Sequence, residues 1–207
     1  MAYSEWKSLQ DVDRYARNRY RSWDQQWLDQ REQKLVKRIF REHDLSGTIL
    51  DIPSGYGRFH RLLEAFGTPL SADLGSKPLH YMTETLGMSG ESVNCAAEKL
   101  PFSDKSVDVI FCFRLMQHIH TGEERKAVLK EFGRVSCRWI VISVYLSNPL
   151  HRLLRAVSSP SARITMLSRS GFESDLQKAD LTILKKVSVA PGLHAQRVYL
   201  LAVGKLP

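Results

Sequence analysis

The chain has 207 residues, of which 43% are hydrophobic and 25% are charged, so it is long enough for one domain with a substantial core. Its apolar runs are shorter than the roughly 20 residues of a membrane span, and its polar N-terminus does not resemble a secretory signal. Three cysteines beside apolar segments, without zinc-like spacing to histidine, predict reduced, buried thiols, no metal and a cytoplasmic protein.

The formal net charge of +8 is unevenly distributed along the chain. Residues 14–41 carry nine arginines and lysines against three acids, and residues 132–172 carry six arginines and no acid. This excess predicts an anionic partner, either a phosphorylated metabolite, a nucleic acid or an anionic membrane surface. It leaves open a peripheral contact with the inner membrane surface. For any single arginine, solvated surface charge is an equally good explanation.

The hydrophobic pattern predicts alternating helices and strands. The first segment, residues 9–43, reads as one or two helices with a loose apolar set. Further helices are expected at residues 58–66, 78–86 and 121–134, the last with Thr121 and Glu124 as a capping box. Strands are expected at residues 48–53, 69–74, 92–96, 107–113, 139–145, 181–189 and 196–203. Residues 147–160 and 162–171 read as helical or irregular.

This alternation predicts an α/β fold with a doubly wound, mostly parallel seven-stranded sheet. The last two strands follow each other closely, which favours an antiparallel hairpin at one edge of the sheet. We expect a single domain over residues 1–207. Within it, residues 1–46 are expected to form an N-terminal helical lid, residues 47–145 a ligand-binding core, and residues 146–207 a substrate-side insertion with the edge hairpin.

The most informative segment is the strand, turn and helix of residues 48–59. The strand ends in Asp51, and Gly55 and Gly57 follow in a turn that brings backbone N–H groups and a helix N-terminus toward a ligand. Asp73 lies 22 residues after Asp51 at the end of the second strand, where a carboxylate can accept both hydroxyls of a ribose. Together these residues predict an adenosine-type ligand, although Asp73 could instead serve only to form its turn.

A longer motif extends this pattern over about half of the chain. The matching positions are Leu50, Asp51, Gly55, Gly57, Asp73, Ala97, Glu98, Leu100, Pro101, Phe102, Asp104, Ser106, Asp108, His118, Glu131, Arg134 and Val135. By these residues and their order, residues 48–145 resemble a class I S-adenosylmethionine-dependent methyltransferase of the small-molecule type, with a Rossmann-like fold. The resemblance specifies the superfamily and not the substrate.

The resemblance implies a site for S-adenosyl-L-methionine. Its expected residues are Asp51, Pro53, Ser54, Gly55, Gly57, Asp73, Leu74, Ala97, Glu98, Phe113 and Arg114. The glycine turn is expected to pass close to the methionine part, and Asp51 to orient the turn or meet the ammonium group. Asp73 is expected to bind the ribose, with Ala97 and Glu98 bordering the adenine. Phe113 and Arg114 are expected to face the methionine or the substrate.

The chain departs from the family pattern at several positions. Pro53 replaces the first glycine of the turn, which fixes a backbone dihedral and removes an N–H donor. Ser54 stands where cysteine is common, and Ala96 stands where an aspartate often contacts the adenine, a contact that Glu98 could supply instead. The turn at residues 136–138 is shorter than usual. These departures leave a plausible cofactor site.

Methyl transfer from a sulfonium chiefly needs an aligned acceptor and exclusion of water, and it needs a base only when the acceptor must lose a proton. His118, just after the fourth strand, is the best candidate base, with a purely structural role as the alternative. Gln117 and His120 are weaker candidates. Arg114 could bind the cofactor carboxylate, an acceptor phosphate or a structural partner.

Two basic segments are expected to meet the substrate. The candidates in the predicted lid and in the acid-free stretch of residues 146–172 are Arg17, Tyr20, Arg21, Trp23, Arg152 and Arg155. The second stretch also has an apolar face that could cover the acceptor or rest on a membrane. A packed helix with a solvated face is the simpler alternative for the first segment.

The sequence therefore predicts a methyltransferase that acts on an anionic small molecule or a glycolipid precursor, such as a phosphorylated sugar. A tRNA or other nucleic-acid methyltransferase is the alternative, although no RNA-binding module and no Asn/Asp-Pro-Pro-Tyr motif are visible. A non-catalytic, cofactor-binding partner subunit is a third possibility, which Pro53 and Ala96 favour.

Overall fold

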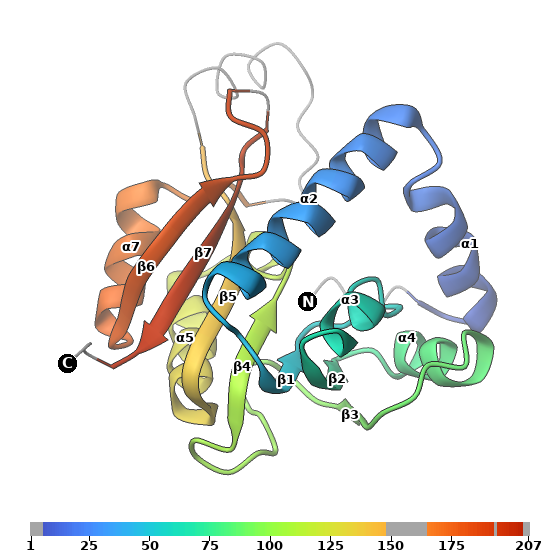
Figure 1. The fold of residues 1–207 in the computed structure, drawn as a ribbon, viewed down its shortest axis with the longest axis horizontal. Coiled ribbons are helices and arrows are strands. Elements are labelled where there is room, and N and C mark those ends of the chain that lie inside the picture. The colour runs from blue at the N-terminus through green and yellow to red at the C-terminus, as the bar shows by residue number, and fades with distance from the viewer. Residues whose placement is uncertain (1–5, 148–164, 193, 205–207) are drawn as a thin grey trace.

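The computed structural model describes residues 6–147, 165–192 and 194–204 (Figure 1). Its centre is a seven-stranded sheet of order β3-β2-β1-β4-β5-β7-β6. The strands are β1 (Gly47–Asp51), β2 (Gly67–Asp73), β3 (Ser92–Asn94), β4 (Val107–Cys112), β5 (Ser136–Tyr145), β6 (Leu181–Ser188) and β7 (Gln196–Val203). The first five are parallel, and β7 pairs antiparallel with both β5 and β6. The predicted α/β fold with an antiparallel edge is confirmed.

The helices also follow the predicted order, with one omission. They are α1 (Leu9–Arg19), α2 (Trp23–Glu42), α3 (His60–Glu64), α4 (Ser76–His80), a π-helical turn (Tyr81–Thr85), a 3₁₀ turn (Met116–His118), α5 (Gly122–Val135) and α7 (Arg169–Lys178). Thr121 and Glu124 form the expected capping box of α5. The sequence analysis missed α7, because only Phe172 and Leu176 mark its buried face and its Ser168 cap lies in an irregular stretch.

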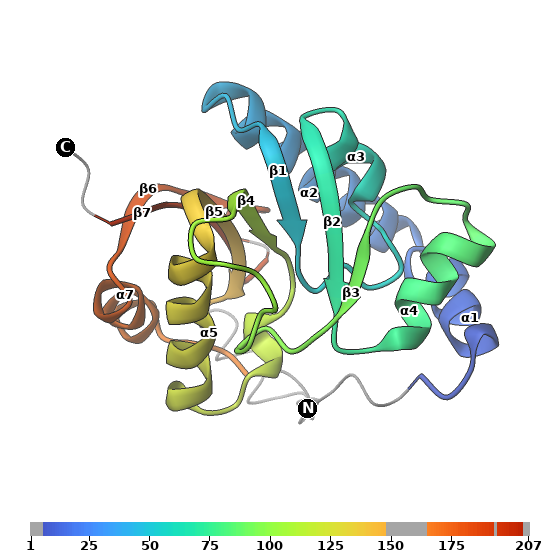
Figure 2. The ribbon, with the colours of Figure 1, turned by 90° about the horizontal axis from the view of Figure 1, so that it is seen from below.

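Helices cover both faces of the sheet (Figure 2). Successive residues of a strand point to opposite faces, so Leu50 and Ile110 pack with α5 and α7, while Ile49 and Val109 pack with α2 and α3. Both faces of the central strands are therefore buried, which explains their nearly continuous apolar sequences. Within the described ranges, every helix is too short or too polar to cross a lipid bilayer.

The predicted lid divides into two parts. Val36, Ile39 and Phe40 in the second half of α2 are fully buried in the core, so this half is a layer of the fold and not a lid. Helix α1 instead packs beside α4 at the other end of the segment (Figure 1). The lid prediction therefore remains for α1, for the connection to α2 and for the exposed first turn of α2, because the buried apolar residues at helical spacing begin at Leu28.

The cysteines only partly follow the expectation of burial. Cys112 is buried in β4, Cys95 is half-buried, and Cys137 is exposed at the start of β5. Cys137 differs because the first residues of β5 extend past the buried centre of the sheet. No group of side chains that could hold a metal ion occurs among the residues that the structure describes.

Candidate functional site

The glycine turn joins β1 to α3 at the carboxyl edge of the parallel strands. Its backbone is held by a hydrogen bond from the Ser54 N–H to the Ala72 carbonyl (2.9 Å) and contains a cis peptide bond before Pro53. Gly55 and Gly57 have φ angles of +56° and +81°, a region that favours glycine. A Cβ atom on Gly57 would lie 2.6 Å from the sulfur of Met88. The sequence of the turn is therefore dictated by backbone conformation and by space.

Asp73 holds this turn against the end of β2. Its Oδ2 accepts a hydrogen bond from the Gly55 N–H (2.9 Å), and its Oδ1 accepts one from the Gly75 N–H (2.7 Å). Burial raises the pKa of Asp73, and the two N–H donors partly oppose that rise. Asp73 thus forms its own turn and also braces the glycine turn, while each oxygen keeps a lone pair for a further donor.

Asp51 lies beside Asp73 and carries a polar atom that needs a partner. Its Oδ2 and the Ser54 hydroxyl are both buried and have no hydrogen-bond partner among the described residues. Burial, and then the neighbouring Asp73, raise the pKa of Asp51 well above its usual range. Buried polar atoms without partners are costly, so these two atoms indicate a ligand with donors or positive charge at the turn.

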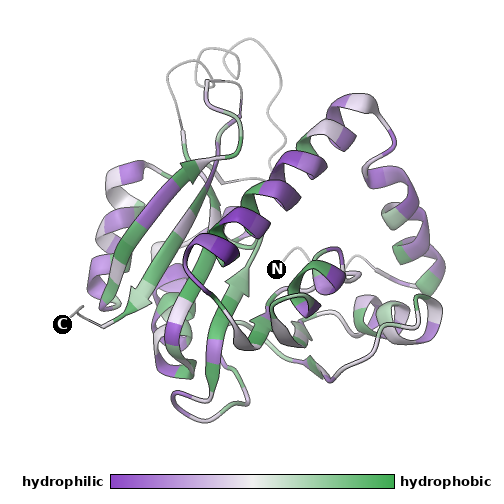
Figure 3. Cartoon of the chain, in the orientation of Figure 1, coloured by the Kyte–Doolittle hydropathy of each residue, from purple (hydrophilic) through white to green (hydrophobic). Residues whose placement is uncertain are grey.

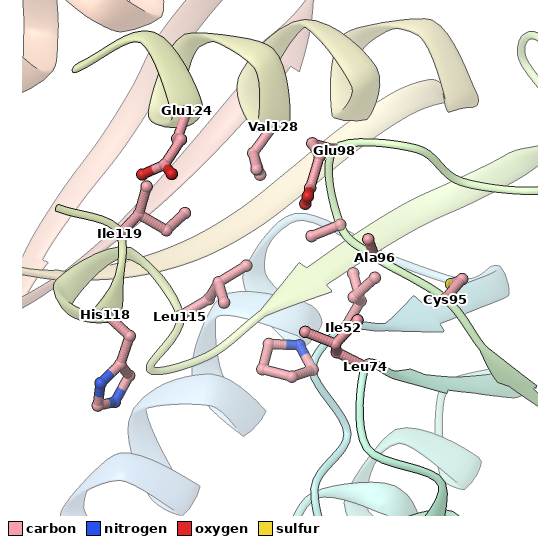
Figure 4. A pocket seen from close by; sticks show the side chains of 12 residues that line it. Ile52, Leu74, Cys95, Ala96, Glu98, Leu115, His118, Ile119, Glu124 and Val128 are labelled. Carbon is pink, nitrogen blue, oxygen red and sulfur yellow. The ribbon is translucent and has the colours of Figure 1, made fainter. Parts of the chain in front are cut away.

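The first cavity lies at the carboxyl ends of β1 and β2 and has a volume of about 140 Å³ (Figure 4). It is lined by Ile52, Pro53, Leu74, Cys95, Ala96, Ala97, Glu98, Leu115, His118, Ile119, Glu124 and Val128. Its walls are mostly apolar, with Glu98 and Glu124 to one side of Leu115 and His118 to the other (Figure 4). An apolar slot with a few polar groups suits a flat heterocycle. Pro53, Leu74, Ala97, Glu98 and His118 were predicted site residues.

A second cavity, also lined by Pro53, has a volume of about 120 Å³. It is lined by Trp6, Tyr15, Tyr20, Pro53, Ser54, Gly55, Tyr56, Arg58, Phe59, Pro78, Phe113 and Arg114. Six of these residues are aromatic and two are arginines, so its character differs from that of the first cavity. Pro53 is the residue that both cavities share, in place of the glycine that the family pattern carries.

A buried ion-pair network supports the second cavity from α2. The fully buried Glu32 accepts hydrogen bonds from Arg58 and, at 2.8 Å, from Arg114. Asp29 also accepts from the Arg58 Nε (2.7 Å). Burial disfavours the charge of Arg114, but Glu32, Tyr145 and Tyr20 together outweigh burial and raise the pKa of Arg114 overall. The structural partner expected as one role for Arg114 is therefore Glu32.

Both arginines keep an unused donor. Arg58 Nη1 and Arg114 Nε are buried and have no hydrogen-bond partner among the described residues. Both guanidinium groups also lie over the ring of Tyr20, at 4.6 and 5.8 Å from its centroid. Burial raises the pKa of Tyr20, although Arg58 and Arg114 oppose the rise, and burial raises the pKa of Tyr56 to about 12. Neutral aromatic rings and two cations therefore face the same small space.

The remaining predicted substrate residues lie away from both cavities. Arg17 pairs with Asp13 on α1 (2.9 Å), and Arg21 and Trp23 are exposed. Arg152 and Arg155 lie outside the described residues. Of the weaker base candidates, Gln117 donates to the Arg114 carbonyl, and His120 contacts Thr165.

Sequence reasoning missed the residues that shape the second cavity. The principal omissions are Glu32, Tyr56 and Arg58. One signal was available for Glu32, because it falls on the same helical face as the apolar Leu28 and Leu35. An acid within an apolar stripe needs a buried partner, and such a partner is a functional clue.

Comparisons with known proteins agree with this geometry. Residues 50–138 match a family model described as "Methyltransferase domain". No curated protein matches the chain significantly.

Several solved structures share the fold. One is magnesium protoporphyrin IX methyltransferase from Synechocystis PCC 6803 with bound SAH. It has a TM-score of 0.75 at 15% identity, and the match covers 93% of this chain and 94% of that one. An S-adenosylmethionine-dependent methyltransferase from Clostridium acetobutylicum has a TM-score of 0.69 at 13% identity, and the match covers 85% of this chain and 92% of that one. A third match is a chain from the complex between the Haloferax volcanii Trm112 methyltransferase activator and a methyltransferase. It has a TM-score of 0.61 at 12% identity, and the match covers 87% of this chain and 96% of that one. At these identities the likeness is one of fold.

Proposed function

We propose that this chain is a class I S-adenosylmethionine-dependent methyltransferase, which its fold and the methyltransferase-domain match at residues 50–138 support, and that its methyl acceptor is an anionic small molecule or a glycolipid precursor. The observation that carries this proposal is the second cavity. Its aromatic walls and the two unused arginine donors favour an acceptor that combines a ring with a carboxylate or phosphate.

The residues of the glycine turn and the first cavity fit the cofactor. We assign the adenine to the cavity between Leu74, Ala97 and Glu98, and the ribose hydroxyls to the remaining lone pairs of Asp73. The buried, unpartnered Oδ2 of Asp51 suits the ammonium group of the methionine part. When bound, S-adenosylmethionine supplies a methyl group on a positively charged sulfur.

In this proposal the second cavity holds and orients the acceptor. Asp29 and Glu32 already balance the two arginines, so the anion is held by directed N–H donors and not by net charge. The surrounding rings exclude water, which methyl transfer requires. His118 remains our candidate base for an acceptor that must lose a proton, and its location in the first cavity makes this role separately testable.

Two measurements test the proposal. Calorimetry should detect binding of S-adenosylmethionine to the wild-type protein, and absence of binding would overturn both the cofactor site and the enzyme. Transfer of a labelled methyl group is then measured on fractionated metabolites, lipids and RNA. We expect label in an anionic metabolite or lipid fraction.

A set of arginine variants locates the acceptor. Arg58→Gln should reduce transfer at least tenfold without weakening cofactor binding, since one charged hydrogen bond is worth about 1.5–3 kcal/mol. Arg58→Lys keeps the charge opposite Glu32 and controls for misfolding, and the exposed Arg14→Gln is the matched surface control. Equal loss in Arg14→Gln and Arg58→Gln would contradict an acceptor role for the second cavity.

The net charge of +8 favours one alternative, a nucleic-acid methyltransferase. Label recovered only in the RNA fraction would support that alternative and overturn the small-molecule proposal. Cofactor binding without transfer to any fraction would instead support a partner subunit that has no catalytic activity of its own.

A further inference from the structure

The outer face of α2 is cationic because most acidic side chains of this helix point inward or form ion pairs. Asp29 and Glu32 turn inward to Arg58 and Arg114, and Glu42 pairs with Lys185 on β6 and, at 4.0 Å, with Arg38. Asp24 alone among the acids of α2 lies exposed without an ion pair in the described part of the chain. Helix α2 is coloured mostly as hydrophilic in Figure 3, and its basic residues outnumber the acids that are left without an ion pair.

Five residues form a continuous line on this surface, which we call the α2 stripe: Trp23, Trp27, Arg31, Lys34 and Arg38. Their spacing of three or four residues places them on one face of the helix. At 1.5 Å per residue the stripe is about 22 Å long. Its second half borders an open groove of about 370 Å³ between α2 and residues 188–189. The stripe is thus an elongated surface that combines indole rings with positive charge.

The tryptophans of the stripe are unusually accessible. Trp23 is 81% exposed and Trp27 is 39% exposed. The guanidinium group of Arg31 lies 4.8 Å from the centroid of the Trp27 ring and donates from Nε to the Val189 carbonyl (3.0 Å). These two contacts hold the Arg31 side chain in place and cover one face of the Trp27 ring. An exposed indole with no core to pack against points to a partner surface.

We propose that the α2 stripe docks this protein on a membrane surface that contains anionic phospholipids. Lys34, Arg38 and the outer nitrogens of Arg31 match lipid phosphates, and indole rings favour the boundary between headgroups and acyl chains. A single-stranded nucleic acid fits less well, because Arg31 already covers a ring face on which a base would stack.

The position of the stripe gives the docking a purpose, a step that rests on the proposed function. Tyr20, which lines the second cavity, precedes Trp23 by three residues. Docking through the Trp23 end therefore places the connection between α1 and α2, which carries Tyr20, beside the membrane. A glycolipid precursor could then be methylated without leaving the bilayer surface.

Vesicle flotation with the full chain tests the docking without cofactor or acceptor, so its outcome is independent of the proposed function. The wild type should float with vesicles of phosphatidylcholine mixed with phosphatidylglycerol and not with phosphatidylcholine alone. Neutralising two cations of the stripe, in Lys34→Gln/Arg38→Gln, should reduce vesicle affinity about thirtyfold. The matched control is Lys130→Gln/Lys178→Gln, which removes the same charge from exposed positions on α5 and α7 across the sheet and should change affinity less than threefold.

Tryptophan fluorescence gives a second readout. The emission of the wild type should shift to shorter wavelength on addition of anionic vesicles, and Trp23→Tyr should lose most of that shift. Equal loss of affinity in the two double variants, or equal binding to neutral vesicles, would overturn the proposal. Tighter, stripe-dependent binding of a single-stranded oligonucleotide that competes with vesicles would also overturn it and identify the surface as a nucleic-acid site.

Discussion

The two cavities that meet at Pro53 differ in composition and in origin. The first is mostly apolar and is built from the ends of the parallel strands and from α5. The second is aromatic and cationic, and α2 supplies the buried acid that holds its two arginines. In the proposed function, the sheet edge and the N-terminal helices therefore have separate roles. The sheet edge would bind the common cofactor, and the helices would support the site of a particular acceptor.

The largest effect should come from the buried acid beneath the second cavity. Glu32→Ala leaves Arg58 and Arg114 without their shared partner, and breaking such a buried pair costs about 3–5 kcal/mol. Urea unfolding should register this loss. Asp29→Ala removes a partly exposed partner of Arg58 and should cost about 1 kcal/mol or less. Equal losses would mean that the network does not organise the cavity, and Glu32→Gln keeps the volume if Glu32→Ala fails to fold.

The next effect tests whether one residue serves both cavities. If His118 is the base, His118→Ala should lower turnover about a hundredfold with cofactor affinity unchanged. His120→Ala, in the neighbouring histidine that contacts Thr165, should have full activity. If His118→Ala instead weakened cofactor affinity and left turnover unchanged, the role of His118 would be to line the first cavity and not to act as a base. That result would sharpen the separation between the cavities.

Asp73 should produce a smaller loss, confined to the cofactor. Asp73→Ala is expected to weaken cofactor binding tenfold or more, because a hydrogen bond to a charged acceptor is worth about 1.5–3 kcal/mol. Asp104→Ala, at another position of the family pattern whose side chain is 75% exposed, should leave affinity unchanged. Calorimetry on folded variants distinguishes the two, and unchanged affinity in Asp73→Ala would remove Asp73 as the ribose ligand.

The first cavity could be predicted because its residues follow directly from local pattern. Most of them lie at the end of a strand or just after it, and parallel strands bring their carboxyl ends to one edge. Pro53, Leu74, Ala97 and Glu98 were expected at the site because residues 48–145 resemble the methyltransferase family, and all four line the first cavity. The same logic predicted the strands, since apolar runs bounded by turns admit few other structures.

The second cavity could not be predicted because it depends on how α2 packs. In the sequence, Arg58 looks like any other basic residue near the start of a helix. Its contact with Glu32, 26 positions earlier in the chain, is visible only in the folded structure. Tyr20 was proposed for its aromatic, basic surroundings, but so were Arg17 and Trp23, which lie elsewhere. Composition identified the right segment, whereas the individual contacts required the tertiary structure.

The smallest effect concerns pH and the buried carboxyl group of Asp51 at the end of β1. The pKa of Asp51 is raised above its ordinary value of 3.8 by burial and by Asp73, so the native state keeps a proton that the unfolded state has lost. The free energy of unfolding of the ligand-free protein should therefore fall as the pH rises from 3.8 through the raised pKa of Asp51. Asp51→Asn should remove the part of this slope that Asp51 contributes, leaving the part from Asp73, whose pKa is also raised, and should stabilise the ligand-free protein at neutral pH.

Cofactor binding should show the opposite dependence on pH. A cationic ligand favours the ionised carboxylate, so wild-type affinity should rise severalfold over the same pH interval, whereas Asp51→Asn should bind weakly with little pH dependence. Thermal unfolding and calorimetry at matched pH values measure the two slopes. If affinity in the wild type did not rise with pH, Asp51 would not face the ammonium group. The positive end of the cofactor would then belong toward the second cavity, and the division between the two cavities would have to be redrawn.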